Sequence, residues 1–233
     1  MSADQAKGKQ GGASSPRDYS AWVKEKSVRI ATELLERCLG FDSATLHEAA
    51  GKIGDLPPEI KPVDASFRVC GPAVTVHSPP GDNLWLHRAI YEAAPGDVLV
   101  VYVEERFDHG YWGEIMAEAA LARKLGGLVI DGCVRDVPLL RSIGFPVFAR
   151  GACIRGTGKD FDARGWINAP VRIGRQTIHA GDLVFGDEDG VVVLPAAQVD
   201  AVLNAAQLRQ QDELALVEAL RNGQRTLDWY GWA

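Results

Sequence analysis

The chain has 233 residues, of which 46% are hydrophobic and 24% are charged, a balance typical of globular proteins with a sizeable core. Its net charge of −6 argues against nucleic-acid binding, because phosphate backbones bind to basic surfaces. No apolar run approaches the roughly 18 residues that a membrane span needs, and the first 20 residues lack the apolar core of a secretory signal. We therefore expect a cytoplasmic protein with no nucleic-acid or membrane partner.

The domain organisation is predicted to be simple. Residues 1–20 are rich in Gly, Ser and Lys with little to bury, which predicts a flexible tail. Residues 21–233 contain neither a linker nor a repeat, which favours a single domain. Its cysteines and histidines lack the spacing of a zinc site, and the stretch RGTGK (155–159) lacks the spacing of a P-loop.

The first part of the chain is predicted to be helical. Apolar residues at helical spacing predict a helix over 22–39. A second, short helix is expected over 41–52, with Asp42 or Ser43 as its N-cap. The proline-rich segment 54–64 is predicted to be a loop.

The centre of the chain alternates between predicted strands and helices. Four segments are predicted as strands: 68–78, 97–103, 127–131 and 145–150. Three segments are predicted as helices: 84–94, 111–126 and 137–144. The second of these is expected to be amphipathic, with one apolar face made of Trp112, Ile115, Met116, Ala119 and Ala122. Near-continuous apolar strands in a β-α-β-α-β order are typical of a parallel sheet covered on both faces.

The last part of the chain has a different pattern. From residue 170 onward, short strands broken by glycines indicate hairpins, and residues 196–223 indicate one long helix. The sequence therefore predicts a single α/β domain in which a central βαβ layer packs against a second sheet rich in antiparallel strands.

Polar residues follow two neighbouring strands of the predicted sheet. The strand 97–103 leads to a helix with Glu114 in its first turn, and the strand closed by Asp131 leads to Arg135 and Asp136. The carboxyl ends of parallel strands meet at one edge, where ligands of open α/β sheets bind. Adjacent strands lie only about 4.8 Å apart, so we expect Glu114 and Asp136 to reach a common point.

These residue types suit a small acidic ligand held through a divalent cation. Two carboxylates that face one space indicate a shared proton or a hard cation, and Mg²⁺ uses only one or two protein carboxylates. Arg135 offers a planar fork for a carboxylate or an oxyanion. The turn at 110–113 offers backbone N–H groups at a helix N-terminus. Purely structural roles remain open. Glu114 could be an acid that stabilises the first turn of its helix, Asp136 could cap a helix, and Arg135 could form an ion pair at the surface.

At these residues the sequence resembles the 4-hydroxy-4-methyl-2-oxoglutarate / 4-carboxy-4-hydroxy-2-oxoadipate aldolases, which are similar in fold to the regulator of ribonuclease activity A proteins. The resemblance runs from about residue 25 to the end of the chain and is carried by the stretches GYWGEIMAEAALARKLGGLVIDGCVRDVPLL, GFPVFARGACIRGTGKD and GDLVFGDEDGVVVLP. It implies a β/β/α sandwich assembled as trimers or hexamers, with active sites between subunits.

The resemblance also implies a reaction. It is the class II cleavage of a 4-hydroxy-2-keto acid to pyruvate and a second keto acid in the catabolism of aromatic compounds, dependent on Mg²⁺ or Mn²⁺ and accompanied by oxaloacetate decarboxylation. By position, Asp136 would hold the metal, Glu114 would support the metal's waters, and Arg135 would contact the pyruvyl carboxylate and carbonyl. Glu213, from a neighbouring subunit, would contact a metal-bound water. The backbone amides that would hold the keto acid belong to Gly110, Tyr111, Trp112 and Gly113.

Two alternatives stay open. A regulator on the same fold that binds a ribonuclease or a helicase would not need Glu114, so the presence of this acid favours the enzyme. A decarboxylase or hydrolase of another keto acid is the second alternative. The segment EERFDHG (104–110) carries more charge than the glycine-rich loop usual at this position, which bears on the choice of substrate.

Overall fold

The structure is a computed structural model that describes residues 18–25 and 29–233. Within that part of the chain, no helix combines the length and the apolar composition needed to cross a bilayer. Most of the predicted tail, residues 1–17, lies outside the described residues. Tyr19, which the prediction also assigned to the tail, packs edge-on against Trp85 with 6.1 Å between ring centroids.

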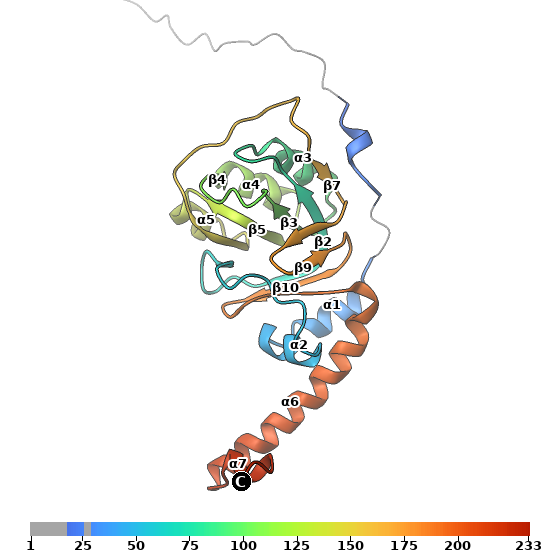
Figure 1. Ribbon diagram of the computed structural model, residues 1–233, viewed down its shortest axis with the longest axis vertical. Coiled ribbons are helices and arrows are strands. Elements are labelled where there is room, and N and C mark those ends of the chain that lie inside the picture. Colours follow the sequence, from blue (N-terminus) through green and yellow to red (C-terminus); the bar gives the residue numbers. More distant parts are fainter. Residues whose placement is uncertain (1–17, 26–28) are drawn as a thin grey trace, which may run out of the picture.

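A parallel sheet forms the centre of the structure (Figure 1). Four strands lie in the order β6-β5-β3-β2, and each neighbouring pair is parallel. The short β4 also pairs in parallel with β5. The bounds of these strands are Val69–His77 (β2), Val98–Tyr102 (β3), Gly110–Trp112 (β4), Gly127–Val134 (β5) and Val147–Ala152 (β6). Because nearly every residue of β2, β3 and β5 is buried, both faces of this sheet are covered, as predicted.

The long strand β2 joins this parallel sheet to antiparallel strands. Residues 73–77 of β2 pair with β3, whereas residues 69–72 pair antiparallel with β10. β10 and β11 form a hairpin, and β8 and β9 form a second, separate hairpin. The short β1 and β7 pair antiparallel with β6 and β2. The bounds are Lys61–Pro62 (β1), Trp166–Ile167 (β7), Val171–Ile173 (β8), Gln176–Ile178 (β9), Leu183–Asp187 (β10) and Gly190–Leu194 (β11). The α/β class is confirmed.

Three apolar clusters hold these layers together. The largest lies between one face of the parallel sheet and the helices α3, α4 and α5, and the second lies between the opposite face and the β8–β9 hairpin. The third packs β10 and β11 against α1, α2 and α6. In Figure 1, α6 extends away from the sheets and ends beside α7. The helix bounds are Ser20–Trp22 (η1), Thr32–Cys38 (α1), Ser43–Ala49 (α2), Leu84–Glu92 (α3), Glu114–Ala122 (α4), Val137–Ile143 (α5), Ala196–Gln198 (η2), Val199–Arg221 (α6) and Thr226–Trp229 (α7).

The helix predicted over 22–39 is wrong at the described residues 23–25 and 29–31, and residues 26–28 lie outside the described part of the chain. Val23 instead forms an isolated parallel bridge with Ile167, and the helix begins only at Thr32. The apolar residues of this segment serve two surfaces, because Val23 packs against the first cluster and Leu34 against the third. A single straight helix cannot reach both surfaces.

The helix predicted over 111–126 also needs correction. Its first two residues belong to β4, and the helix begins at Glu114. The predicted apolar face is therefore wrong at Ile115, which is 74% exposed, and at Ala122, which is also exposed. The buried face consists of Met116, Ala117 and Ala120. By contrast, the predicted cap of α2 is confirmed, since the Asp42 side chain accepts a hydrogen bond from the Thr45 N–H.

Candidate active site

The strand that precedes Arg135 is longer than predicted. β5 continues through Asp131 to Val134, with a bulge between Ile130 and Cys133. Asp131 is 2% exposed, and its Oδ1 accepts a hydrogen bond of 2.6 Å from Arg150 Nε. Asp131 therefore does not close the strand. It forms a buried ion pair that links β5 to β6.

The turn after β5 presents Arg135 and Asp136. The Arg135 N–H donates to the Trp112 carbonyl at 2.9 Å, which fixes the turn to β4. Asp136 is the N-cap of α5 and has a φ of 59°, a left-handed conformation that aspartate tolerates better than most residues. Its Oδ2 accepts from the Glu114 N–H at 3.2 Å and lies 3.8 Å from Arg135 Nε. Glu114 and Asp136 therefore come together, but the contact joins the Asp136 carboxylate to the Glu114 backbone N–H at the start of α4, not one carboxylate to the other.

Two glycines create the space for this arrangement. A Cβ at Gly113 would collide with Asp136 Oδ2, so only glycine lets that carboxylate approach the start of α4. A Cβ at Gly110 would collide with the Cys153 carbonyl. The Gly110 N–H donates to the Arg155 carbonyl at 2.7 Å, so Gly110 contributes open space to the site rather than a free amide.

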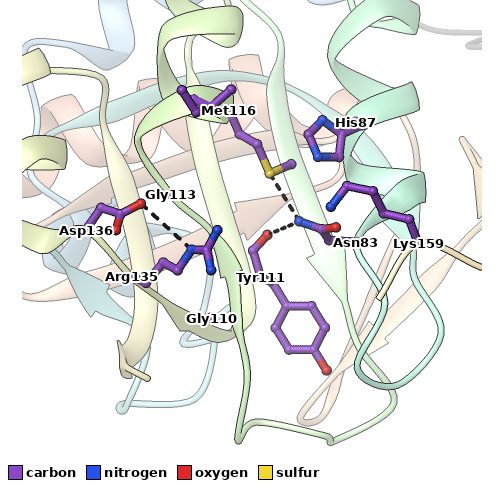
Figure 2. A pocket seen from close by; sticks show the side chains of 10 residues that line it. Asn83, His87, Gly110, Tyr111, Gly113, Met116, Arg135, Asp136 and Lys159 are labelled. Carbon is purple, nitrogen blue, oxygen red and sulfur yellow. Dashed lines mark hydrogen bonds and ion pairs between the residues drawn. The ribbon is translucent and has the colours of Figure 1, made fainter. Parts of the chain in front are cut away.

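A cavity of about 260 Å³ opens beside Arg135 and Asp136. Figure 2 shows these two side chains on one side of it and His87 and Lys159 on the other. The residues that line it are Asn83, His87, Gly110, Tyr111, Gly113, Ile115, Met116, Arg135, Asp136 and Lys159. The structure therefore brings five of the sequence-derived candidates to one cavity, and it adds a second wall from α3 and from the loop after β6.

Three sequence-derived candidates do not line the cavity. Trp112 is fully buried in the core and stacks on Phe145 at 5.9 Å. Glu114 meets the site through its backbone N–H, while its partly exposed side chain makes no hydrogen bond or ion pair within the described part of the chain. Glu213 lies in α6, where it forms an ion pair of 2.8 Å with Arg209.

The second wall consists of residues that the sequence reasoning missed. The Asn83 side chain donates to the Tyr111 carbonyl at 2.9 Å, while its buried Oδ1 has no partner among the described residues. Lys159 comes from the RGTGK stretch and makes no ion pair within residues 18–25 and 29–233. Burial, together with the nearby Lys159 charge, lowers the pKa of His87, which keeps that imidazole neutral at pH 7. Spacing alone gave no signal for these residues, because a helix and a loop bring them together.

The cavity is suited to a small molecule that is acidic at both ends. Arg135 and Lys159 approach it from opposite walls, and guanidinium and ammonium groups both bind carboxylates. The Tyr111 hydroxyl is engaged elsewhere, since it donates to the Arg106 carbonyl at 2.7 Å and accepts from the Gly81 N–H at 2.9 Å. Tyr111 thus ties two neighbouring loops together.

The donor set fits a hard cation that keeps most of its waters. Among residues 18–25 and 29–233, no three His, Cys, Asp or Glu side chains converge as a ligand set for a metal. Asp136, whose side chain is 38% exposed, and Glu114 at the same helix start offer one or two carboxylates. Mg²⁺ and similar ions accept so sparse a set, whereas zinc takes three or four protein ligands.

Comparison with known proteins gives the family. The family model described as Aldolase/RraA (RraA-like) matches residues 41–193, more than half of the chain. The chain belongs to the Aldolase/RraA family. A relative from Halalkalibacterium halodurans, which bears the provisional name 4-hydroxy-4-methyl-2-oxoglutarate aldolase, is 36% identical over 175 residues. That alignment covers 75% of this chain and 82% of the relative.

Solved structures of other proteins share this fold. An uncharacterized protein of Pseudomonas syringae pv. tomato is 30% identical, with a TM-score of 0.75, over 87% of this chain and 94% of its own. RraAS2 of Streptomyces coelicolor, described as an unusual member of the RNase ES inhibitor RraA protein family, is 27% identical, with a TM-score of 0.69, over 80% of this chain and 96% of its own. The resemblance seen in the sequence is confirmed. The whole cavity lies inside the matched region, whereas α6 lies outside it.

Proposed function

We propose that this Aldolase/RraA protein is a divalent-metal-dependent (class II) pyruvate aldolase. Its substrates would be 4-carboxy-4-hydroxy-2-oxoadipate and 4-hydroxy-4-methyl-2-oxoglutarate, each cleaved to pyruvate and a second keto acid. The observation that carries this proposal is the placement of Arg135 and Asp136 at the N-terminus of α4, with Lys159 on the opposite wall of one cavity. The name of the Halalkalibacterium halodurans relative supports the same chemistry.

The two cationic side chains match the two acidic ends of such substrates. Arg135 would bind the carboxylate and the carbonyl oxygen of the 2-keto acid end, assisted by the backbone of residues 110–113. Lys159 would bind the carboxylate at the far end. Burial and the Lys159 charge lower the pKa of His87, which leaves Lys159 as the cation of this wall. This assignment explains why the cavity has a cation on each wall.

Cleavage is a retro-aldol step in these terms. A water held by the Glu114 carboxylate would take the proton from the C4 hydroxyl and pass a proton on to that carboxylate, while the C4 oxygen becomes the carbonyl of the departing keto acid. The C3–C4 electron pair moves into the pyruvate enolate, whose oxygen lies beside the Arg135 guanidinium. Proton return to C3 then gives pyruvate. Decarboxylation of oxaloacetate forms the same enolate, so we expect it as a side activity.

Mg²⁺ or Mn²⁺ would be held directly by Asp136. Glu114 and, from a neighbouring subunit, Glu213 would hold its waters. When bound, such a cation supplies Lewis-acid stabilisation of the negative charge that develops on the enolate oxygen. The exposed Asp136 carboxylate and the sparse donor set support this assignment.

We infer a homotrimer or homohexamer with active sites between subunits. Support comes from the far end of the chain, where α6 extends from the body and α7 lies at its tip (Figure 1). This region exposes many large apolar side chains, as is typical of a surface that another subunit covers. They are Leu208, Leu214, Val217, Leu220, Leu227, Trp229, Tyr230 and Trp232.

A coupled pyruvate assay tests the proposal. We expect the purified protein with Mg²⁺ or Mn²⁺ to release pyruvate from 4-carboxy-4-hydroxy-2-oxoadipate, and EDTA to abolish this release. Arg135→Ala should lower kcat/KM by about 100-fold or more, because it removes a cation from the developing oxyanion. The matched control is Arg123→Ala, an exposed arginine at the end of α4 that does not line the cavity. Absence of pyruvate with metal present, or full activity in Arg135→Ala, contradicts the proposal.

A regulatory role is the second candidate, supported by the description of the Streptomyces coelicolor relative as an RNase ES inhibitor family member. It predicts that the protein slows RNA cleavage by an RNase E-type ribonuclease without any release of pyruvate. The same effect should persist in Arg135→Ala, since a surface interaction does not need the cavity. RNA cleavage assays with both proteins therefore separate the two functions.

A further inference from the structure

A short segment outside the family-matched region is attached to β7 and to α3, the helix that contributes to one wall of the cavity. Residues 18–25, here named the N-terminal strap, precede the matched region, which begins at residue 41. Val23 forms a parallel bridge with Ile167 of β7, and the Lys24 N–H donates to the Ile167 carbonyl at 3.0 Å. The Asn168 side chain donates in turn to the Lys24 carbonyl at 2.9 Å. The backbone of the strap thus extends the edge of the sheet at β7.

The strap also packs against one face of α3. The Tyr19 hydroxyl donates to Glu92 at 3.0 Å, and its ring packs edge-on against Trp85. The guanidinium carbon of Arg88 lies 4.5 Å from both of these ring centroids, so it is held between them. Residues 85, 88 and 92 share one face of the helix, whereas His87 projects into the cavity. Helix α3 therefore lies between the strap and the cavity.

The loop that carries Lys159 is fastened on both sides of this residue. On one side, the Gly158 N–H donates to the Gly81 carbonyl at 2.8 Å, and the Asp82 carboxylate accepts from the Asp160 N–H at 2.5 Å. On the other side, the Trp85 Nε1–H donates to the Ala163 carbonyl at 3.2 Å. Trp22 of the strap reaches the same end of the loop, where the Arg164 guanidinium lies 5.7 Å from its ring centroid. Lys159 thus sits between an anchor built into the matched region and an anchor that the strap supports.

We propose that the strap positions the Lys159 wall of the active site. Tyr19 and Trp22 hold α3 and the 153–165 loop, and through them they set the distance between Lys159 and Arg135. None of the described strap residues lines the cavity, so the strap acts only through these two elements. This proposal deepens the proposed function. It rests on that function only for the KM measurement, because the tryptic cleavage of the loop does not depend on any activity.

The test uses the full chain with Tyr19→Ala and Trp22→Ala combined. We expect KM for 4-carboxy-4-hydroxy-2-oxoadipate to rise about tenfold, because small displacements of a binding group cost one to two orders of magnitude. The value of kcat should change less than about twofold, since Arg135 and Asp136 keep their own anchors. Trypsin should also cleave faster after Lys159 and Arg164, which lie in the loop that the strap fastens.

Two matched variants separate positioning from general damage. The single variant Tyr19→Phe keeps the ring contacts with Trp85 and Arg88, so its KM should stay within about twofold of the wild-type value. Glu25→Ala changes an exposed strap residue and should alter neither readout. Circular dichroism and the thermal midpoint show whether each variant folds.

The outcomes are distinct. In a folded double variant, unchanged KM and unchanged tryptic cleavage overturn the proposal, as does a fall in kcat with KM unaltered. If the wild-type protein releases no pyruvate, the proposed function fails, yet the cleavage rates after Lys159 and Arg164 still decide whether the strap holds the loop. Faster cleavage in the double variant supports the strap in either case.

Discussion

Asp136 performs two tasks, because its backbone starts α5 in a left-handed conformation while its carboxylate faces the N-terminus of α4. The two tasks draw on different properties of the residue. The left-handed backbone needs a side chain such as Asp or Asn, whereas cation binding needs the negative charge. Substitutions at this position can therefore separate folding from catalysis.

We predict that Asp136→Asn abolishes pyruvate release with little loss of stability, because asparagine tolerates the same φ but carries no charge. Asp136→Ala should abolish activity and also lower the free energy of unfolding by roughly 1–2 kcal/mol, since alanine does not favour that conformation. The pyruvate assay and urea unfolding of both variants measure these effects. Equal stability of the two variants would contradict the role of the backbone conformation.

The residues of the site differ in how far the sequence predicts them. Arg135 and Asp136 follow a strongly apolar strand, so the rule that ligands bind at the carboxyl ends of parallel strands pointed to them, and both line the cavity. Asn83 and Lys159 carry no such signal. Their placement depends on where α3 and the 153–165 loop pack, which is a property of the tertiary structure.

At the scale of elements, the strands of the parallel sheet were predicted better than the segments that link them. The buried strands have continuous apolar runs, whereas the three residues of β4 are too few to show a period. Pairing with the extended end of β5 decides their conformation, and this also sets where α4 begins. Glu114 was predicted in the first turn of this helix, but its place as the first residue of α4 follows from a strand pairing that no local pattern revealed.

The end of β2 holds a histidine that links three elements. His77 is 4% exposed, stacks on Trp166 of β7 at 3.7 Å and bonds to Glu104 after β3 at 2.7 Å. Burial lowers the pKa of His77, and this effect outweighs the Glu104 carboxylate, which raises it. The folded protein thus keeps His77 neutral, whereas the unfolded chain takes up a proton below about pH 6.5.

Proton uptake by the unfolded chain means that stability decreases as the pH falls through about 6.5. We predict that His77→Phe, which can still stack on Trp166 but cannot be protonated, reduces the loss of stability between about pH 7.5 and about pH 5.5. Urea unfolding at the two pH values measures this loss. The control is His179→Phe, a change at an exposed histidine, and a slope equal to wild type in His77→Phe would refute the prediction.

At the scale of the whole molecule, the proposal implies a site shared between subunits, with Arg135 from one and Glu213 from its neighbour. Arg135→Ala and Glu213→Gln should each be nearly inactive alone. Oligomers formed from an equal mixture of the two variants should regain roughly a quarter of the wild-type activity. About half of the sites receive an intact Arg135, and independently about half receive an intact Glu213, so about a quarter receive both. Co-expression followed by the pyruvate assay measures this. Activity equal to the mean of the separate variants would show that no site combines the two chains.

The third apolar cluster has a consequence for how the protein is made. It joins residues near the start of the chain, such as Cys38 and Leu46, to residues as late as Leu203 and Ala206. During synthesis, the apolar faces of α1 and α2 therefore stay without their α6 packing partner until α6 has left the ribosome. At common rates of synthesis the roughly 150 intervening residues take about 10–30 s to appear. During that interval the nascent chain exposes an apolar surface that can associate with other chains. A ribosome-associated chaperone that covers apolar segments should therefore raise the yield of folded protein.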